Sequence, residues 1–237
     1  GNGVLMTGVT SGLVQGNTIT GNFDPSPAPV PNIGAGVAIE NASGVTVGGT
    51  AAGARNVLSG NQTQGVFIGY NSSGNWVAGN HIGTDAAGTA AQANGHSGVL
   101  LFFNADNNTI GGASAAARNI ISGNGVGVWI EDSSDANVVS GNYIGVDASG
   151  AADLGNSLAG VNVRLNALNN RIGGTAAGEG NVVSGNGAMA VNVDNGAHGT
   201  VVQGNYLGTN AAGAAAVQND GGGVSVGNSA NVTIGGA

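Results

Sequence analysis

Three charged residues at nearly equal spacing could act together on a bound molecule. Glu131, Arg164 and Asp194 follow one another in steps of 33 and 30 residues, which match a repeat described below and predict successive coils. Two coils separate the carboxylates by roughly 9–10 Å, at the upper edge of the ~6.5–9.5 Å used by inverting glycosidases. An arginine between two carboxylates is more simply explained as a run of surface salt bridges. It would also keep both acids ionised, whereas a general acid needs a raised pKa.

A second group of side chains is suited to binding rather than to reaction. Neighbouring coils are expected to present Phe67, Tyr70, Leu100, Phe102 and Trp129 as one apolar face, with Phe103 nearby. The grouping matters because aromatic residues make up only 4% of the chain. Exposed aromatic faces stack on sugar rings or bind another protein. Cover by a loop or a neighbouring domain, or packing between coils, explains the same pattern.

The sequence offers few residues that could bind a metal ion. Asp85, Asp147 and Asn210 recur in equivalent loops, and oxygen-rich loops are able to hold calcium. A calcium site needs roughly six to eight oxygen ligands, and these loops otherwise supply mainly Ala and Gly. We therefore predict that the three side chains stabilise turns, that the chain has no metal site or cofactor, and that calcium is the minor alternative.

The remaining basic side chains show no catalytic arrangement. His81, His96 and His198 lie in different parts of the repeat and lack metal-ligand spacing, which favours surface or loop positions. Arg55 and Arg118 occupy equivalent positions of the repeat. We expect these two arginines to donate hydrogen bonds to loop carbonyls.

The composition excludes several classes of partner. The chain has 237 residues, of which 48 are Gly and 32 are Asn, a net charge of −8, four Arg, no Lys and no Cys. So few cations argue against nucleic acid and anionic membrane surfaces. The lack of Cys removes disulfides, thiolate zinc sites and cysteine nucleophiles. No apolar run approaches the roughly 18 residues of a membrane span, and no signal peptide is recognisable.

Much of the Gly and Asn belongs to a repeat. An aliphatic residue precedes Gly-Gly at Val47-Gly48-Gly49, Ile110-Gly111-Gly112, Ile172-Gly173-Gly174 and Ile234-Gly235-Gly236, in steps of 63, 62 and 62 residues. A shorter Gly-Val-x-aliphatic pattern divides each unit into two coils of about 31 residues. The visible chain therefore holds about seven and a half coils.

Each coil contains three short strand candidates with alternating apolar residues. Asn75, Asn108, Asn137 and Asn170 each precede the inward aliphatic residue of the second strand by two positions. They should point inward at the same corner of successive coils. We predict an internal ladder of hydrogen-bonded amides; ligand binding by the repeated Asn is the alternative.

These patterns resemble the right-handed parallel β-helix repeat proteins of bacteria. The matching stretches are Gly79 to Gly88 (GN-x-I-G-T-D), Gly98 to Leu101 (G-V-x-I), Asn108 to Gly112 (N-x-I-G-G) and Arg118 to Asn124 (R-N-x-I-S-G-N). The resemblance covers nearly the whole chain and implies an all-β right-handed parallel β-helix, with an extracellular or cell-surface location. It is poorly informative about function, because the same coil serves lyases, hydrolases, epimerases, adhesins and passive stalks.

The sequence predicts one β-solenoid domain over residues 1–237, interrupted by a Pro-rich insertion over residues 21–35 that replaces an IGTDAAG-type loop. All four prolines lie there, which predicts a rigid extended excursion. Neither end shows a cap, which solenoids use against end-to-end pairing. We expect either continuation of the array or head-to-tail self-association.

Regular coils and the small number of candidate catalytic residues favour a non-catalytic structural or adhesive segment, such as a stalk, fibre or filament element. Such a segment would bind glycan or protein on the outer face of the first strand. The alternative is a polysaccharide-active enzyme, a hydrolase, lyase or epimerase, that uses Glu131, Asp194 and Arg164 on the same face.

Overall fold

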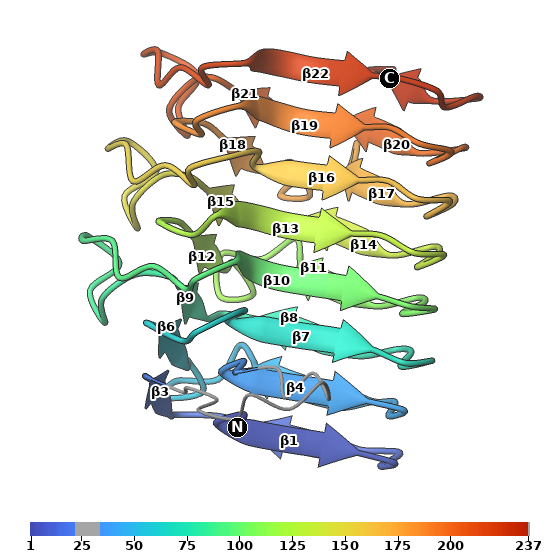
Figure 1. Ribbon diagram of the computed structural model, residues 1–237. Coiled ribbons are helices and arrows are strands. Elements are labelled where there is room, and N and C mark those ends of the chain that lie inside the picture. The colour runs from blue at the N-terminus through green and yellow to red at the C-terminus, as the bar shows by residue number, and fades with distance from the viewer. Residues whose placement is uncertain (22–33, 237) are drawn as a thin grey trace.

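The computed structural model describes residues 1–21 and 34–236, which wind into a parallel β-solenoid (Figure 1). The chain advances one coil at a time from the N-terminal to the C-terminal end, in the right-handed sense. The all-β class, the three strands per coil and the number of coils were predicted from the repeat, and the structure confirms them. The predicted Pro-rich insertion lies almost entirely outside the described residues, since residues 22–33 are not among them.

Each coil contributes one strand to each of three parallel sheets. Sheet A consists of β1 (Val4–Thr7), β4 (Val37–Glu40), β7 (Val66–Gly69), β10 (Ser97–Phe102), β13 (Val126–Ile130), β16 (Val161–Val163), β19 (Met189–Val193) and β22 (Gly222–Val226). Sheet B consists of β2 (Gly12–Val14), β5 (Val45–Gly48), β8 (Trp76–Ala78), β11 (Thr109–Gly111), β14 (Val138–Ser140), β17 (Arg171–Gly173), β20 (Val201–Gln203) and β23 (Thr233–Ile234). Sheet C consists of β3 (Thr18–Thr20), β6 (Val57–Ser59), β9 (His81–Ile82), β12 (Ile120–Ile121), β15 (Tyr143–Ile144), β18 (Val182–Val183) and β21 (Tyr206–Leu207).

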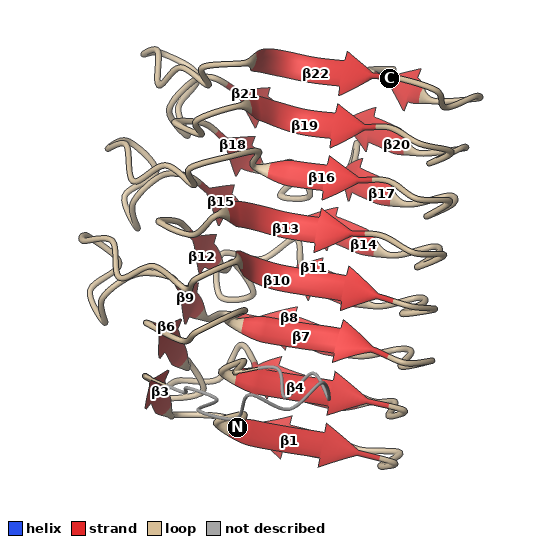
Figure 2. Ribbon diagram, viewed as in Figure 1, coloured by secondary structure: helices blue, strands red, loops and turns tan. Residues whose placement is uncertain are grey.

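Figure 2 shows sheet A at the front, with loops carrying the chain between the sheets at both sides. The described residues contain no helix, and within them no helix is long and apolar enough to cross a membrane. Alternate side chains of each strand point inward. In β13, Val128 and Ile130 are fully buried while Trp129 faces out, as the alternation predicted. The inward aliphatic residues of all three sheets form one continuous core along the axis.

Buried asparagines fill the corner between sheets A and B. Asn75 donates to Asn108 at 2.9 Å, Asn108 to Asn137 at 3.1 Å and Asn137 to Asn170 at 3.1 Å, in each case from Nδ2 to Oδ1. The Oδ1 of Asn108, Asn137 and Asn170 also accepts the backbone N–H of the preceding asparagine. The other hydrogen of Nδ2 is donated to a backbone carbonyl of the preceding coil, as Asn108 and Asn137 show. We call this column the A–B ladder. It satisfies the polar groups of the Asn75, Asn108 and Asn137 amides inside the core.

The other two corners contain ladders of the same construction. The B–C ladder between sheets B and C is Asn17, Asn56, Asn80, Asn119, Asn142, Asn181 and Asn205. The C–A ladder is Asn61, Asn94, Asn124, Asn156, Asn186 and Asn219. Spacing identified the A–B ladder, and the Gly-Asn pairs contribute many members of the other two.

The glycines of the repeat are explained by these ladders. Gly83 has a φ of +83°, and a Cβ at this position would meet the Ser122 carbonyl and the Asn124 amide of the C–A ladder. Gly111 has a φ of +93° and faces Asn142 of the B–C ladder in the same way. The Ile-Gly-Thr-Asp and Ile-Gly-Gly signatures therefore both mark places where the backbone of one coil touches a ladder amide of the next.

Long loops leave the C–A corner at every second coil and form hairpins closed by the antiparallel bridges Thr84 to Ala91, Val146 to Asp153 and Thr209 to Ala216. Asp147 Oδ1 accepts the N–H groups of Ala151 and Ala152, both at 3.1 Å, and the hydroxyl of Ser149 at 2.7 Å. Burial acts to raise the pKa of Asp147, but these hydrogen bonds outweigh it and lower the pKa. Asp85 and Asn210 accept equivalent N–H groups. The recurring residues stabilise turns, as predicted.

Gly83→Ala tests the contact between the repeat glycines and the ladders. Replacing Gly83 should cost about 3 kcal/mol or more, because the left-handed backbone and the collision with the ladder both oppose a Cβ. Gly53→Ala is the matched control, since Gly53 has a φ of +82° with nothing within 4 Å of its Cβ position, and should cost about 1 kcal/mol. Equal losses in chemical denaturation would contradict the role given to the ladder.

Asp147→Asn and Asp147→Ala test the hairpin loops. The amide keeps the acceptor oxygen, as Asn210 does naturally, so Asp147→Asn should cost less than about 0.5 kcal/mol at pH 7, against about 1 kcal/mol for Asp147→Ala. Because folding lowers the pKa of Asp147, the carboxylate stabilises the protein above its ordinary value of 3.8 and loses this effect as pH falls through the folded-state value. Thermal unfolding against pH should therefore show the small deficit of Asp147→Asn vanishing in acid. A deficit that persists there would contradict this account.

Candidate functional site

The outer face of sheet A carries the side chains that the sequence predicted as candidate catalytic or binding residues. Strand pairing aligns Leu100, Trp129, Asn162 and Asn192 in one outward column. Asn192 Nδ2 donates to Asn162 Oδ1 at 3.0 Å, so the two amides extend the column beyond the indole ring. We call the outward side chains of this sheet and of its adjoining turn the sheet A face.

Glu131, Arg164 and Asp194 form the next column, on successive coils, as their spacing predicted. Glu131 N–H donates to Leu101, Arg164 N–H to Ile130 and Asp194 N–H to Val163, so the sheet pairing continues just past each strand. Arg164 Nε donates to Glu131 Oε2 at 2.8 Å. Asp194 Oδ1 instead accepts the N–H of Asn195 at 2.7 Å. The salt-bridge run predicted over three residues is thus a pair in the described structure.

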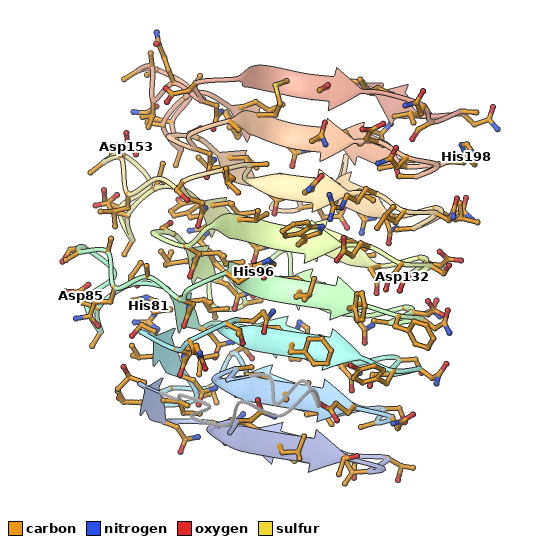
Figure 3. The ribbon with its side chains drawn as sticks, in the orientation of Figure 1. His81, Asp85, His96, Asp132, Asp153 and His198 are labelled. Carbon is orange, nitrogen blue, oxygen red and sulfur yellow. The ribbon has the colours of Figure 1, made fainter. Side chains whose placement is uncertain are left out.

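Trp129 is contacted from both neighbouring coils. His96 (labelled in Figure 3) comes from the coil before and stacks on the indole, with centroids 5.0 Å apart and planes 8° apart. The Arg164 Cζ, one coil later, lies 4.5 Å from the indole centroid. The sequence placed His96 in a surface or loop position, and the exposed ring agrees. Its stacking was missed, because the loop before β10 gives no periodic signal that relates it to Trp129.

The predicted aromatic face is contiguous but is partly covered. Phe67 is 1% exposed and Leu100 is 7% exposed, and both pack in a small cluster with Ala35 and Ala38. The expectation that all five apolar residues present a free surface is corrected accordingly: Phe67 and Leu100 are packing residues. They lie on the outer side of the sheet, where alternation places a side chain but does not reveal its neighbours.

On the sheet A face, Tyr70, Phe102 and Phe103 adjoin one another and are half-buried or exposed, and we call them the aromatic cluster. Tyr70 meets Phe102 edge to face at 6.3 Å between ring centroids. Phe103 lies 6.1 Å from Tyr70 and 6.2 Å from Phe102 and is 47% exposed. The three rings therefore form one surface beside the end of β10.

Two members of the aromatic cluster adopt a backbone conformation that aromatic residues rarely use. Tyr70 has a φ of +54° and Phe103 a φ of +52°, at the turn position that Asn195 fills with a φ of +50° in a later coil. Asn tolerates this left-handed region, whereas other residues pay roughly 1–2 kcal/mol there. The turn is left-handed in other coils too, as at Asp132 with a φ of +56° and Leu165 with a φ of +54°. The coil therefore sets this conformation, and an aromatic residue there costs stability.

Acidic side chains surround the single cation of this region. Glu131 and Asp194 flank Arg164, while Asp132 and Asp135 lie in the turn after β13, where Figure 3 labels Asp132. Burial, and the charge of nearby Asp106 in addition, raises the pKa of Asp135, although the Leu168 N–H opposes this. The sheet A face is therefore negative beside its aromatic cluster.

The remaining candidates are dispersed over the molecule. His198 is exposed as expected, whereas His81 is only 3% exposed on β9, which corrects its surface assignment. Burial first, and then the charge of Arg55, lowers the pKa of His81. Arg55 and Arg118 donate from Nε to the carbonyls of Gly79 and Gly141, which confirms their predicted bonding. Within the described ranges, no three His, Asp or Glu side chains gather in a way suited to a metal ion.

Comparison with known proteins gives a match in structure only. No protein-family model and no curated protein sequence matches the chain. A double mutant of the periplasmic alginate epimerase AlgG matches 98% of this chain with 18% identity and a TM-score of 0.65. The crystal structure of AlgG without these mutations matches 98% of it with 15% identity and a TM-score of 0.59.

In both cases the match covers 47% of the epimerase chain, so the present chain spans about half the length of these proteins. At this level of identity the likeness concerns the fold. The chain is therefore a parallel β-solenoid that is similar in fold to the periplasmic alginate epimerase AlgG.

Proposed function

We propose that this chain recognises a polysaccharide along the sheet A face. The observation that carries the proposal is the aromatic cluster, because three adjoining rings are exposed or half-buried at a turn where two of them adopt a strained backbone. Aromatic rings of this kind stack on the apolar faces of sugars. Successive coils continue the surface in both directions, which suits a long linear ligand.

Polar groups beside the aromatic cluster supply hydrogen bonds. The half-buried amides of Asn162 and Asn192 and the carboxylate of Asp194 follow Trp129 along the solenoid. Acidic groups outnumber the one arginine, and that arginine is already paired with Glu131. A polyanion would be repelled by this surface. We therefore favour a neutral glycan as the ligand.

The same proposal concerns location. Polysaccharides are met mainly outside the cytoplasm, and the similar solved structures are of a protein named as periplasmic. A secreted or cell-surface segment that binds glycan without changing it would serve as a structural or adhesive element.

A second candidate function is chemical modification of the polysaccharide. It is favoured by the comparisons, since the matching structures are all of an epimerase that acts on a polysaccharide. Glu131 and Asp194 are the acids available on the face for proton transfer, and Arg164 between them would hold a sugar carboxylate or orient Glu131.

The recognition proposal is tested by changing Tyr70, Phe102 and Phe103 together to Ala and measuring binding to neutral and uronic-acid glycans by calorimetry. Affinity for a neutral glycan should fall at least tenfold, because three ring contacts are lost. Leu13→Ala is the control, since Leu13 is 60% exposed on sheet B, and it should leave affinity unchanged. Unaltered binding in the triple variant, with its fold intact, would overturn the proposal.

The second candidate is tested by turnover on the same glycans, alginate among them, followed by proton NMR of the products. If it is correct, Glu131→Gln and Asp194→Asn should each lower the rate at least 100-fold, the usual loss when proton transfer is removed. Glu179→Gln is the matched control, because Glu179 also pairs with an arginine, Arg171, at 3.0 Å. No turnover of any glycan that binds, or equal losses in all three variants, would contradict catalysis on this face.

A further inference from the structure

The four arginines of the chain divide into two kinds. Arg164 pairs with Glu131, and Arg171 pairs with Glu179. Arg55 and Arg118 have no carboxylate within salt-bridge distance among the described residues. This is unexpected in a chain with 12 acidic residues and a net charge of −8, where an exposed guanidinium has many carboxylates to choose from.

The two unpaired arginines line the same hollow. It has a volume of about 150 Å³ and lies outside sheet C, on a different side from the sheet A face. Its other lining residues are His81, Ile120, Ala87, Ala115 and Ala148. The alanines come from three separate loops, and their small side chains leave the space between the arginines open.

Both guanidinium groups are held in place at one edge. Arg55 Nε donates to the Gly79 carbonyl at 3.3 Å, and Arg118 Nε donates to the Gly141 carbonyl at 3.2 Å. Arg118 is also stacked on Tyr143, with its Cζ 4.1 Å from the ring centroid. A guanidinium has five N–H donors, so each arginine keeps the four of its two Nη atoms for another partner.

The coil itself does not need these arginines. The third unit of the repeat has Gly180 at the equivalent position, directly before Asn181 of the B–C ladder, and the ladder and strand pairing continue there. Arg55 and Arg118 lie two coils apart, roughly 9–10 Å along the axis. Two side chains and one small anion can span this distance.

We propose that the hollow between Arg55, His81 and Arg118 binds an oxyanion, the group shared by carboxylate, sulfate and phosphate. The planar donor fork of arginine matches two oxygens of such a group. The anion brings negative charge between two guanidinium groups that line the same hollow as the ring of His81. The carrier of the oxyanion is either a free inorganic ion or an acidic sugar.

The binding test titrates the intact chain with sodium sulfate, sodium phosphate and sodium glucuronate, using calorimetry at constant ionic strength. We expect saturable binding of one anion per chain, weakened at least tenfold in Arg55→Gln and in Arg118→Gln. Arg171→Gln is the matched control and should bind as the wild type does. Stronger binding of glucuronate identifies an acidic sugar, and stronger binding of sulfate or phosphate identifies an inorganic oxyanion or its ester.

His81 provides a second measurement inside the hollow. The charged residues near its ring are Arg55, Arg118 and Asp85. Bound anion should raise the pKa of His81, followed by the NMR shift of its ring protons, since a negative charge favours the imidazolium. Arg55→Gln should raise the same pKa without anion and abolish the further rise.

Absence of saturable binding by all three anions, or equal affinity in the wild type and the two arginine variants, would overturn the proposal. Folding of the variants is checked by thermal unfolding. Glycan binding on the sheet A face should be unchanged in Arg55→Gln and Arg118→Gln, so this site and the polysaccharide face fail or succeed separately.

Discussion

The structure depends on the way a buried side-chain amide completes a corner. At each corner the backbone turns sharply and leaves N–H and C=O groups that no strand can pair. An asparagine in that place accepts two hydrogen bonds through Oδ1 and donates two through Nδ2, as Asn108 does between Asn75, Asn137 and the Ser72 carbonyl. No apolar residue of the same size can replace it without leaving orphaned polar groups. Three such ladders hold the three sheets in register.

This constraint separates two kinds of position. Inward and corner positions are fixed by the ladders and by the glycines that touch them, so they repeat. Outward positions face solvent and vary, which is where Trp129, Arg164 and the aromatic cluster occur. The same separation applies to the hollow outside sheet C, where Arg55 and Arg118 recur but Gly180 does not continue the column. Side chains that can change from coil to coil without disturbing the ladders are the ones free to serve a ligand.

Much of the fold followed from the sequence, because the 62-residue unit records the geometry of two coils. The strand positions, the inward face of β13 and the A–B ladder could be read from spacing alone. Less of the site could be read. The columns Leu100–Trp129 and Glu131–Arg164–Asp194 were correct, yet the burial of Phe67, the stacking of His96 and the burial of His81 depend on loops whose paths have no period. Period predicts which residues share a column, but contact between a column and a loop depends on loop conformation.

The ladders also have a direction. In all three corners Nδ2 donates to the asparagine of the following coil, so every Oδ1 points toward the preceding coil. The amide dipoles therefore add along the axis, just as peptide dipoles add along an α-helix. The β-sheets themselves contribute only a small net dipole. Along each ladder, Oδ1 accepts from the preceding coil, while one Nδ2 hydrogen is donated to the following coil and the other to a carbonyl of the preceding coil. Stacking of such coils is consequently polar, and only an addition in the same orientation continues the amide chains.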